Sequence, residues 1–227
     1  MDTRGAETTR RTLLETAAQL FDQHGYAGTS ISDISTASGR TSGAIYFHFA
    51  SKENLALAVL QEHFATWPEL VERYRASGRP ALEQLVALSF SVARAFRDDI
   101  VVRAGARLWM ERKAINAPLP APFVGWIDVV SALLTEARKE GTLAPGIVPC
   151  TAAHGVVCAF FGLHTVSDAL GSREQIEDEL HNLWLLLLAA LQAQPDPPAL
   201  LAHVIGHPHI PAAATGEAPA RPSQAPA

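Results

Sequence analysis

The sequence predicts an all-α protein. Apolar residues recur at helical spacing through most of the 227-residue chain, and glycine or proline separates each such segment from the next. No stretch shows the sustained apolar–polar alternation that a half-buried β-strand would show. Apolar residues make up 48% of the composition, which is enough for a sizeable core and excludes a globally disordered chain.

The first predicted helix covers residues 8–24. Leu13, Ala17 and Phe21 follow one another at intervals of four residues, so they lie on one helical face. Thr8 or Thr9 can cap the start of this helix, and a glycine follows its end.

Two short helices are expected next. Ser30 and Asp33 have the spacing of a capping box, which predicts a helix start, and Gly39 stops this helix after about two turns. A turn of a few residues leads into a second short helix over residues 42–49. Two short helices joined by a glycine-containing turn are typical of a helix-turn-helix.

A longer helix is predicted over residues 52–75, and Pro68 lies inside its apolar stripe. Because proline has no N–H to donate to the carbonyl of Phe64, we expect a kink or a break there. Further amphipathic segments are predicted at residues 80–97, 99–113, 120–140, 149–170 and 173–191.

Composition and charge exclude several classes of protein. The longest strongly apolar run, residues 181–191, is shorter than the ~20 residues that span a membrane, so no membrane partner is expected. The N-terminus has no apolar stretch of the kind found in signal peptides. The two cysteines, Cys150 and Cys158, read as reduced core residues, which favours a cytoplasmic protein.

The net charge of −5 argues weakly against a nucleic-acid partner. Residues 1–52, however, carry equal numbers of basic and acidic side chains, so the whole negative excess lies beyond them. A small nucleic-acid site near the N-terminus is therefore compatible with the charge, although charge alone does not predict one.

The second short helix has the side chains that a DNA-reading helix needs. Its outward sides carry Ser42, Gly43, Tyr46, Phe47 and His48. The small residues let the backbone approach base edges, and the tyrosine and histidine can donate to phosphate oxygens. Lys52 opens the next helix, where a cation and a helix N-terminus both favour phosphate.

The residue identities from 25 to 55 indicate DNA binding more specifically than the spacing of the helices does. The string contains Gly25-Tyr26, Thr29-Ser30-Ile31, Ile34, Gly39, Ser42-Gly43-Ala44-Ile45-Tyr46-Phe47-His48-Phe49, Ser51-Lys52-Glu53 and Leu55. This string resembles the DNA-binding domain of the tetracycline-repressor (TetR) family. The resemblance implies a three-helix DNA-binding domain, with a helix-turn-helix, on a helical ligand-binding and dimerisation domain.

The resemblance also implies roles for single residues. It assigns phosphate contacts to Tyr46, His48 and Lys52, and base-facing positions to Ser42, Gly43 and Phe47. Many members have a lysine where this chain has Ser42 and an apolar residue where it has Arg40, so either residue could replace the usual base-contacting lysine. The expected DNA-binding residues are Thr29, Ser30, Arg40, Thr41, Ser42, Gly43, Tyr46, Phe47, His48 and Lys52.

The second half of the chain narrows the resemblance. The strings Val102-Arg103-Ala104-Gly105-Ala106-Arg107-Leu108 and Pro118-Leu119-Pro120-Ala121-Pro122-Phe123, with Trp126, are similar to the γ-butyrolactone-receptor branch of the family. Members of that branch are autoregulator receptors that repress antibiotic-biosynthesis and regulatory genes. Their ligands are small signalling lactones, butenolides or furans. The alternative is a pseudo-receptor of the same fold that responds to an antibiotic or another hydrophobic compound.

A ligand pocket is expected between the C-terminal helices. The resemblance makes Trp126 a pocket wall, and His63 shares an apolar stripe with Trp67 on the helix that joins the two domains. Each of these residues could instead be plain core. Among the candidate pocket residues, aromatic side chains outnumber charged ones, so a neutral, alkyl-bearing ligand is favoured. The candidate ligand-binding residues are His63, Phe64, Trp67, Trp109, Met110, Phe123, Trp126, Phe160 and His164.

No motif points to a metal, a cofactor or catalysis. His203, His207 and His209 lie in a proline-rich context in which we expect no folded metal site. The chain has no Gly-x-Ser-x-Gly, His-Glu-x-x-His or phosphate-loop pattern. A helical enzyme with His63 or His164 as base is a remote alternative, and a DNA-binding module without a small-molecule response is a third.

The sequence thus predicts three parts. Residues 1–51 form the DNA-binding domain, and residues 52–194 form the ligand-binding and dimerisation domain, with a homodimer through residues 149–191. Residues 195–227 are rich in proline and alanine, so we expect a disordered, dispensable tail, apart from a short helix near Leu200. The dimer would bind a pseudo-palindromic double-stranded operator, and ligand would release it.

Overall fold

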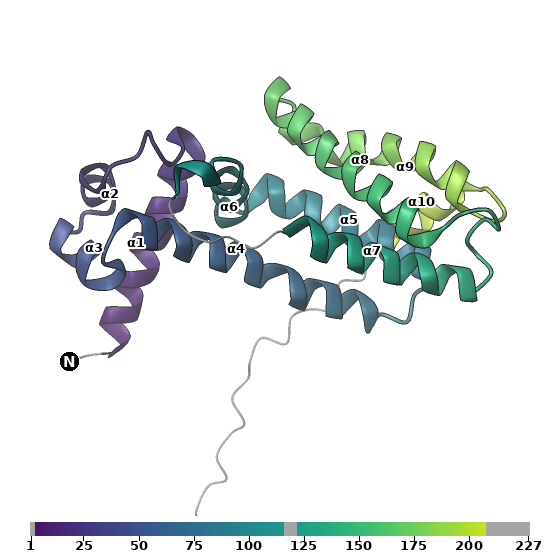
Figure 1. The fold of residues 1–227 in the computed structure, drawn as a ribbon, viewed down its shortest axis with the longest axis horizontal. Coiled ribbons are helices and arrows are strands. Elements are labelled where there is room, and N and C mark those ends of the chain that lie inside the picture. Colours follow the sequence, from purple (N-terminus) through teal and green to yellow (C-terminus); the bar gives the residue numbers. More distant parts are fainter. Residues whose placement is uncertain (1–2, 116–121, 208–227) are drawn as a thin grey trace, which may run out of the picture.

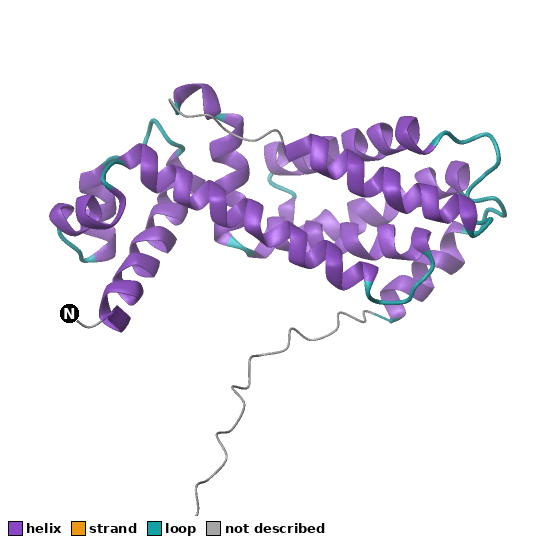
Figure 2. Cartoon of the chain, turned by 60° about the horizontal axis from the view of Figure 1, so that its bottom comes forward, coloured by secondary structure: helices purple, strands orange, loops and turns teal. Residues whose placement is uncertain are grey.

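The computed structural model describes residues 3–115 and 122–207 of the chain (Figure 1). These residues form α-helices, two short 3-10 helices and one isolated β-bridge between Leu143 and Gln192. Helices fill nearly all of the described chain in Figure 2. The prediction of an all-α protein is confirmed.

The N-terminal domain consists of α1 (Thr3–His24), α2 (Ile31–Ser38) and α3 (Ser42–Phe49), which lie together at one end of the molecule in Figure 1. α1 begins earlier than the sequence predicted. Thr8 and Thr9 are not caps, because their hydroxyls donate to the carbonyls of Arg4 and Gly5 one turn back inside the helix.

α4 (Lys52–Arg75) runs from the N-terminal domain along the C-terminal one (Figure 1). It continues through Pro68 as one helix, so the break that we considered at this proline does not occur. Proline costs one hydrogen bond, but Trp67, Leu70 and Val71 are buried on both sides of it, and this packing holds the helix together.

The C-terminal domain contains α5 (Ala81–Asp98), α6 (Ile100–Met110), α7 (Pro122–Lys139), α8 (Pro149–Leu170) and α9 (Ile176–Leu191). Its core surrounds Trp184, which is 1% exposed and donates through Nε1 to Ser89 Oγ at 2.7 Å. Pro118 and Pro120, part of the predicted start of α7 and of the receptor-like string, lie outside the described residues.

The short helix expected near Leu200 is confirmed, and it belongs to the folded domain. Residues Pro197–Gly206 form α10, which packs against α5 and α9. Asp196 caps it, and Leu201 and Val204 are 0% and 4% exposed in the C-terminal core. Two of its prolines stand in the first turn, where a missing N–H costs nothing, so the proline-rich composition is compatible with a helix. Residues 208–227, including His209, lie outside the described residues.

The two hydrophobic cores do not divide at residue 51. The first core contains the buried residues of α1–α3 together with the first half of α4 and Val101, Ala104 and Leu108 of α6. α6 therefore packs on both α1 and α4 and belongs to the N-terminal core as much as to the C-terminal domain. This helix ties the two domains together.

α8 is long and apolar enough to span a membrane by length and composition, but only 28% of its most apolar window is buried in this single chain. Cys150 and Cys158 lie on it and are exposed, so the prediction that they are core residues is wrong. Val166 and Leu170 of α8 and Leu186 of α9 are also exposed, at 55%, 75% and 73%. α8 and α9 thus present an uncovered apolar surface.

Candidate DNA-binding surface and ligand cavity

Side-chain caps fix the two helices of the helix-turn-helix. Ser30 and Asp33 form the predicted capping box at the start of α2, and the hydrogen bonds from Ser30 lower the pKa of Asp33. Gly39 ends α2 with φ of 63°, a conformation that a side chain would strain. The Thr41 hydroxyl accepts from the N–H of Ala44 and caps α3. The turn between the helices is therefore set by local chemistry.

α3 separates its buried and exposed faces sharply. Ile45 and Phe49 are 0% and 5% exposed in the N-terminal core, whereas Tyr46 and Phe47 are 53% and 74% exposed. Around them the predicted DNA-binding residues Ser30, Arg40, Thr41, Ser42 and Gly43 are exposed, and His48 is half-buried. Gly43 has open space where a Cβ would stand, apart from an ordinary contact with Thr41. A slim, exposed helix N-terminus of this kind can enter a major groove.

Thr29, one of the predicted DNA contacts, does not lie where the sequence predicted. Thr29 is 2% exposed, and its hydroxyl donates to the carbonyls of Leu20 and Gly25, so the prediction that this side chain faces DNA is wrong. Its β-branched side chain anchors the loop after α1 instead. Sequence spacing could not reveal this, because a threonine before a helix reads equally well as a cap.

Lys52 has a structural role that the sequence did not indicate. Its Nζ donates to the carbonyls of Tyr26 and Thr29, each at 3.0 Å, and lies 4.2 Å from the centre of the Tyr26 ring. Tyr26 donates in turn to Glu53, and burial followed by that hydrogen bond raises the pKa of Tyr26 to about 12. An ammonium has three protons, so one remains for a phosphate.

A cavity of about 470 Å³ lies between α4, α5, α6, α7 and α8, and we call it the central cavity. Seven of the nine predicted ligand-binding residues line it: His63, Trp67, Trp109, Met110, Phe123, Trp126 and His164. Phe160 lies elsewhere, in an adjoining apolar cavity of about 40 Å³ that shares Trp126 and Phe161 with it. Phe64 packs between the two cores, edge-on to His63, and does not line the cavity.

Aromatic rings form a continuous wall around the central cavity. Phe96 stacks on Trp67 with ring centres 5.9 Å apart, and Trp67 meets Trp126 edge to face at 5.6 Å. On the other side, Phe123 contacts both Phe161 at 4.9 Å and Trp109 at 4.8 Å. Phe96 and Phe161 were missed by the sequence analysis, because nothing in their local pattern separates a cavity wall from plain core. Such a wall suits an apolar ligand body.

Two histidines place nitrogen atoms without partners beside this wall. His63 Nδ1 and His164 Nε2 are buried and have no hydrogen-bond partner of normal geometry among the described residues, although the Val102 backbone lies close enough to His63 to oppose part of the effect of burial on its pKa. Both rings flank Phe96, with ring centres 6.2 and 4.5 Å from it. Burial lowers the pKa of each imidazole to about 4, so both are neutral at pH 7. Buried polar atoms usually have partners, and a polar group on a ligand could supply them.

One edge of the central cavity is polar and touches the N-terminal domain. Arg103 pairs with Asp22 of α1 at 3.0 Å, and Arg107 donates to the carbonyl of Asp22 at 2.6 Å. One helical turn further, the Glu111 carboxylate accepts from the N–H of Tyr26 at 2.7 Å. α6 therefore connects the cavity wall directly to the segment between α1 and α2. The sequence indicated only the helix over residues 52–75, α4, as the link between the two domains.

Gly105 explains why α6 lies so close to α4. A Cβ at this position would stand 2.4 Å from Cβ of His63 and 2.5 Å from its Cγ. Only a glycine allows this approach. The contact joins a cavity histidine to the helix that packs on α1.

Within residues 3–115 and 122–207 no three His, Cys, Asp or Glu side chains are grouped to hold a metal ion. His203 and His207 have ring centres 4.8 Å apart, but the only ion pair of His203 in that range is with Glu83, at 3.5 Å.

An exposed helix-turn-helix and an internal aromatic cavity, joined by α4 and α6, define a DNA-binding regulator that responds to a small molecule. Residues 13–59 match the family model "Bacterial regulatory proteins, tetR family", and residues 79–193 match "Tetracyclin repressor-like, C-terminal domain". The chain therefore belongs to the TetR family of transcriptional repressors.

Relatives give a finer position within this family. The A-factor receptor protein of Streptomyces griseus is 33% identical over 199 residues, which cover 88% of this chain and 68% of that protein. A solved structure described as a molecular basis for control of antibiotic production by bacterial hormones is 44% identical, covers 82% of this chain and 98% of that one, and has a TM-score of 0.75. A gamma-butyrolactone receptor structure is 31% identical, covers 90% and 99%, and also has a TM-score of 0.75.

Proposed function

We propose that this chain acts in the cytoplasm as a dimeric repressor that holds a pseudo-palindromic operator and is released by a small signalling molecule of the γ-butyrolactone, butenolide or furan type. The observation that carries the proposal is the central cavity, because its walls belong to α4 and α6, which both pack on the N-terminal domain. A ligand that favours one arrangement of these helices would change the separation of the two α3 helices, which must be ~34–36 Å to fit one DNA turn. Genes for antibiotics or other secondary metabolites are the proposed targets.

The proposed ligand is mainly apolar and carries polar groups at two places. The aromatic wall supports an alkyl chain, and the unpartnered nitrogens of His63 and His164 support hydroxyl or carbonyl groups near Phe96. Because both imidazoles are neutral at pH 7, a neutral ligand fits better than an acid.

Trp126 provides the test of the cavity. Trp126→Ala should fold and bind operator DNA but should fail to release it when a synthetic γ-butyrolactone is added, as measured by fluorescence anisotropy. Val124→Ala is the matched control, because Val124 lies on the same helix, is 59% exposed and does not line the cavity. Normal release by Trp126→Ala would remove this residue from the ligand site.

The same titration separates the alternatives. A pseudo-receptor would ignore lactones, butenolides and furans and would respond to hydrophobic antibiotics. A DNA-binding module without a small-molecule response would ignore all of them. We do not propose an enzyme, since neither His63 nor His164 is hydrogen-bonded to a carboxylate in the described part of the chain, as an oriented catalytic base would be.

The proposed DNA interface is formed by Tyr46, Phe47, His48 and Lys52 with the exposed residues at the start of α3. Arg40 and Ser42 are both exposed, so either of them is a candidate for the residue that contacts the bases. Arg40→Ala and Ser42→Ala should therefore be compared on operator and on random DNA. The variant that loses affinity for the operator alone, by ~10-fold or more, identifies this residue, whereas a uniform loss on both DNAs indicates a phosphate contact.

The proposed dimer uses the uncovered apolar surface of α8 and α9. Leu186 is 73% exposed in one chain and lies within the continuously apolar part of α9, residues 183–191, so a partner that covers this part would remove apolar surface from water. Leu186→Glu should shift the protein to a monomer in sedimentation at micromolar concentration, and operator affinity should fall with it. Val124→Glu is the control for a charge at an exposed apolar site on a different helix, α7. A wild-type monomer at that concentration contradicts the proposal.

A further inference from the structure

A second cavity lies in the C-terminal domain, formed by the end of α4, α5, α9 and α10. It has a volume of about 400 Å³ and shares no lining residue with the central cavity. We call it the distal cavity. Its apolar side consists of Ala87, Phe90, Val204 and Ile205. Nothing in the function proposed above uses this space.

A guanidinium nitrogen in the wall of the distal cavity has no partner. Arg79 lies in the loop between α4 and α5, and its Nη2 donates to the carbonyl of His207 at the end of α10. Its Nη1 is buried and makes no hydrogen bond in the described residues. A charged donor removed from water in this way requires an acceptor, and an anionic oxygen is the strongest one.

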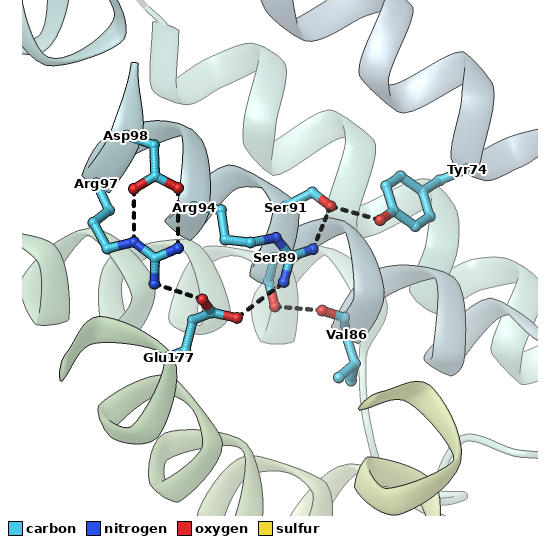
Figure 3. Close-up of polar contacts among 8 residues, drawn as sticks. All are labelled: Tyr74, Val86, Ser89, Ser91, Arg94, Arg97, Asp98 and Glu177. Carbon is cyan, nitrogen blue, oxygen red and sulfur yellow. Dashed lines mark hydrogen bonds and ion pairs between the residues drawn. The ribbon is translucent and has the colours of Figure 1, made fainter. Parts of the chain in front are cut away.

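The Glu177 carboxylate, which also lines the distal cavity, does not repel an anion. Figure 3 shows the Glu177 side chain between two arginines: it pairs with Arg94 at 3.0 Å and with Arg97 at 2.6 Å. Arg97 also pairs with Asp98, so this cluster holds two positive and two negative charges and is neutral as a whole. Asp178 is exposed at the cavity, where water screens its charge.

The polar wall is also held in place before any ligand arrives. Arg94 donates to Ser91 Oγ at 2.9 Å, and Ser91 shares a hydrogen bond of 2.6 Å with the Tyr74 hydroxyl, as Figure 3 shows. This chain of contacts fixes α4, α5 and α9 relative to one another. A preorganised wall lowers the entropy cost of binding.

From the unpartnered Arg79 nitrogen, the neutral cluster and the apolar side, we propose that the distal cavity is a second ligand site, specific for small carboxylic acids. The carboxylate binds Arg79 Nη1, and the apolar or aromatic body lies against Phe90 and Val204. This preference is opposite to that of the central cavity, which favours a neutral ligand. α10, which lies in the proline-rich segment, supplies one wall of the site through Val204 and Ile205.

The test compares two probes that differ only in charge. Phenylacetate and phenylacetamide are titrated into the full-length protein by isothermal titration calorimetry. We expect the acid to bind at least about tenfold more tightly than the amide, and Arg79→Met to remove that preference. Arg75→Met is the matched control, because Arg75 is a nearby exposed arginine paired with Glu72 and does not line the cavity.

The outcomes separate this site from the inducer cavity. Trp126→Ala should bind phenylacetate as the wild type does, whatever it does to operator release. Equal binding of acid and amide, no binding of the acid at millimolar concentration, unchanged acid binding by a folded Arg79→Met, or loss of binding in Trp126→Ala would each overturn the proposal. A thermal unfolding curve establishes whether each variant is folded.

Discussion

The two hydrophobic cores of this chain differ in the cavities that they enclose. In the N-terminal core, Leu13, Phe21, Ile34 and Ile45 are all 0% exposed, and the exposed side chains of α3 form the proposed DNA-binding surface. The C-terminal core instead surrounds cavities of about 470, 400 and 40 Å³. Of the N-terminal domain's residues, only Asp22 at the end of α1 lines any of these three cavities.

This difference shows how one helical chain can be rigid at one end and adaptable at the other. A filled core holds the recognition helix at a fixed angle, because close-packed side chains resist displacement. A hollow core gives up packing energy and gains an internal surface on which a ligand can act. The predictions below test the difference, beginning with the largest expected effect.

Two tryptophans of the C-terminal domain should differ in their contribution to stability. Trp184 is 1% exposed, is hydrogen-bonded to Ser89 and borders only the small cavity of about 40 Å³, so Trp184→Ala should lower the free energy of unfolding by ~3–5 kcal/mol. Trp126 borders two cavities, so Trp126→Ala should cost less by ~1 kcal/mol or more. Urea unfolding measures both. Equal costs would mean that the cavity wall is as tightly packed as the rest of the core.

Acid should destabilise the protein through the histidines of the hollow core. Burial lowers the pKa of His63 from 6.5 to about 4, so between these values the unfolded chain binds a proton that the folded chain does not. The stability is therefore complete above pH 6.5 and falls as the pH drops towards 4, by up to ~3 kcal/mol for His63.

Unfolding at pH 7 and pH 5 measures this effect. His63→Gln cannot take up the proton, so it should be less sensitive to pH than the wild type. His24→Gln, at an exposed histidine of α1, serves as the control and should keep the wild-type dependence. An identical dependence in His63→Gln would show that this histidine is already accessible to protons in the folded state.

The junction between the two regions should respond to a single methyl group. Gly105→Ala places a Cβ 2.4 Å from His63 Cβ, so α6 must move away from α4, at a cost of ~1–3 kcal/mol. Gly125→Ala is the control, since a Cβ there meets nothing within 4 Å and a helical alanine stabilises by ~0.5–1 kcal/mol. Thermal unfolding should give opposite signs for the two variants.

The smallest effect is expected in the N-terminal domain. Ser30→Ala removes the capping box of α2 and should cost ~1 kcal/mol, with a matching loss of operator affinity if α2 frays. Ser32→Ala, two residues on at an exposed position inside α2, should be close to neutral. Equal stability of the two variants would show that the fold around α2 does not depend on its cap.

Local chemistry determined much of this protein. The helical periodicity, the capping box at Ser30 and Asp33 and the stop at Gly39 predicted the all-α fold and the helix-turn-helix, because each depends on neighbours within a few residues. The resemblance of residues 25–55 to the TetR family was confirmed for the same reason: a recognition helix is a continuous stretch of chain.

Tertiary contacts decided the rest. Burial of Thr29, the attachment of Lys52 to two carbonyls, the passage of α4 through Pro68 and the packing of α10 into the C-terminal core all depend on side chains distant in sequence or on packing that offsets a poor local preference. The sequence predicted seven lining residues of the central cavity but not Phe96 or Phe161. The local pattern around an apolar helical residue is the same whether it faces a cavity or another side chain. Whether space remains between helices is a property of their packing, which no local pattern records.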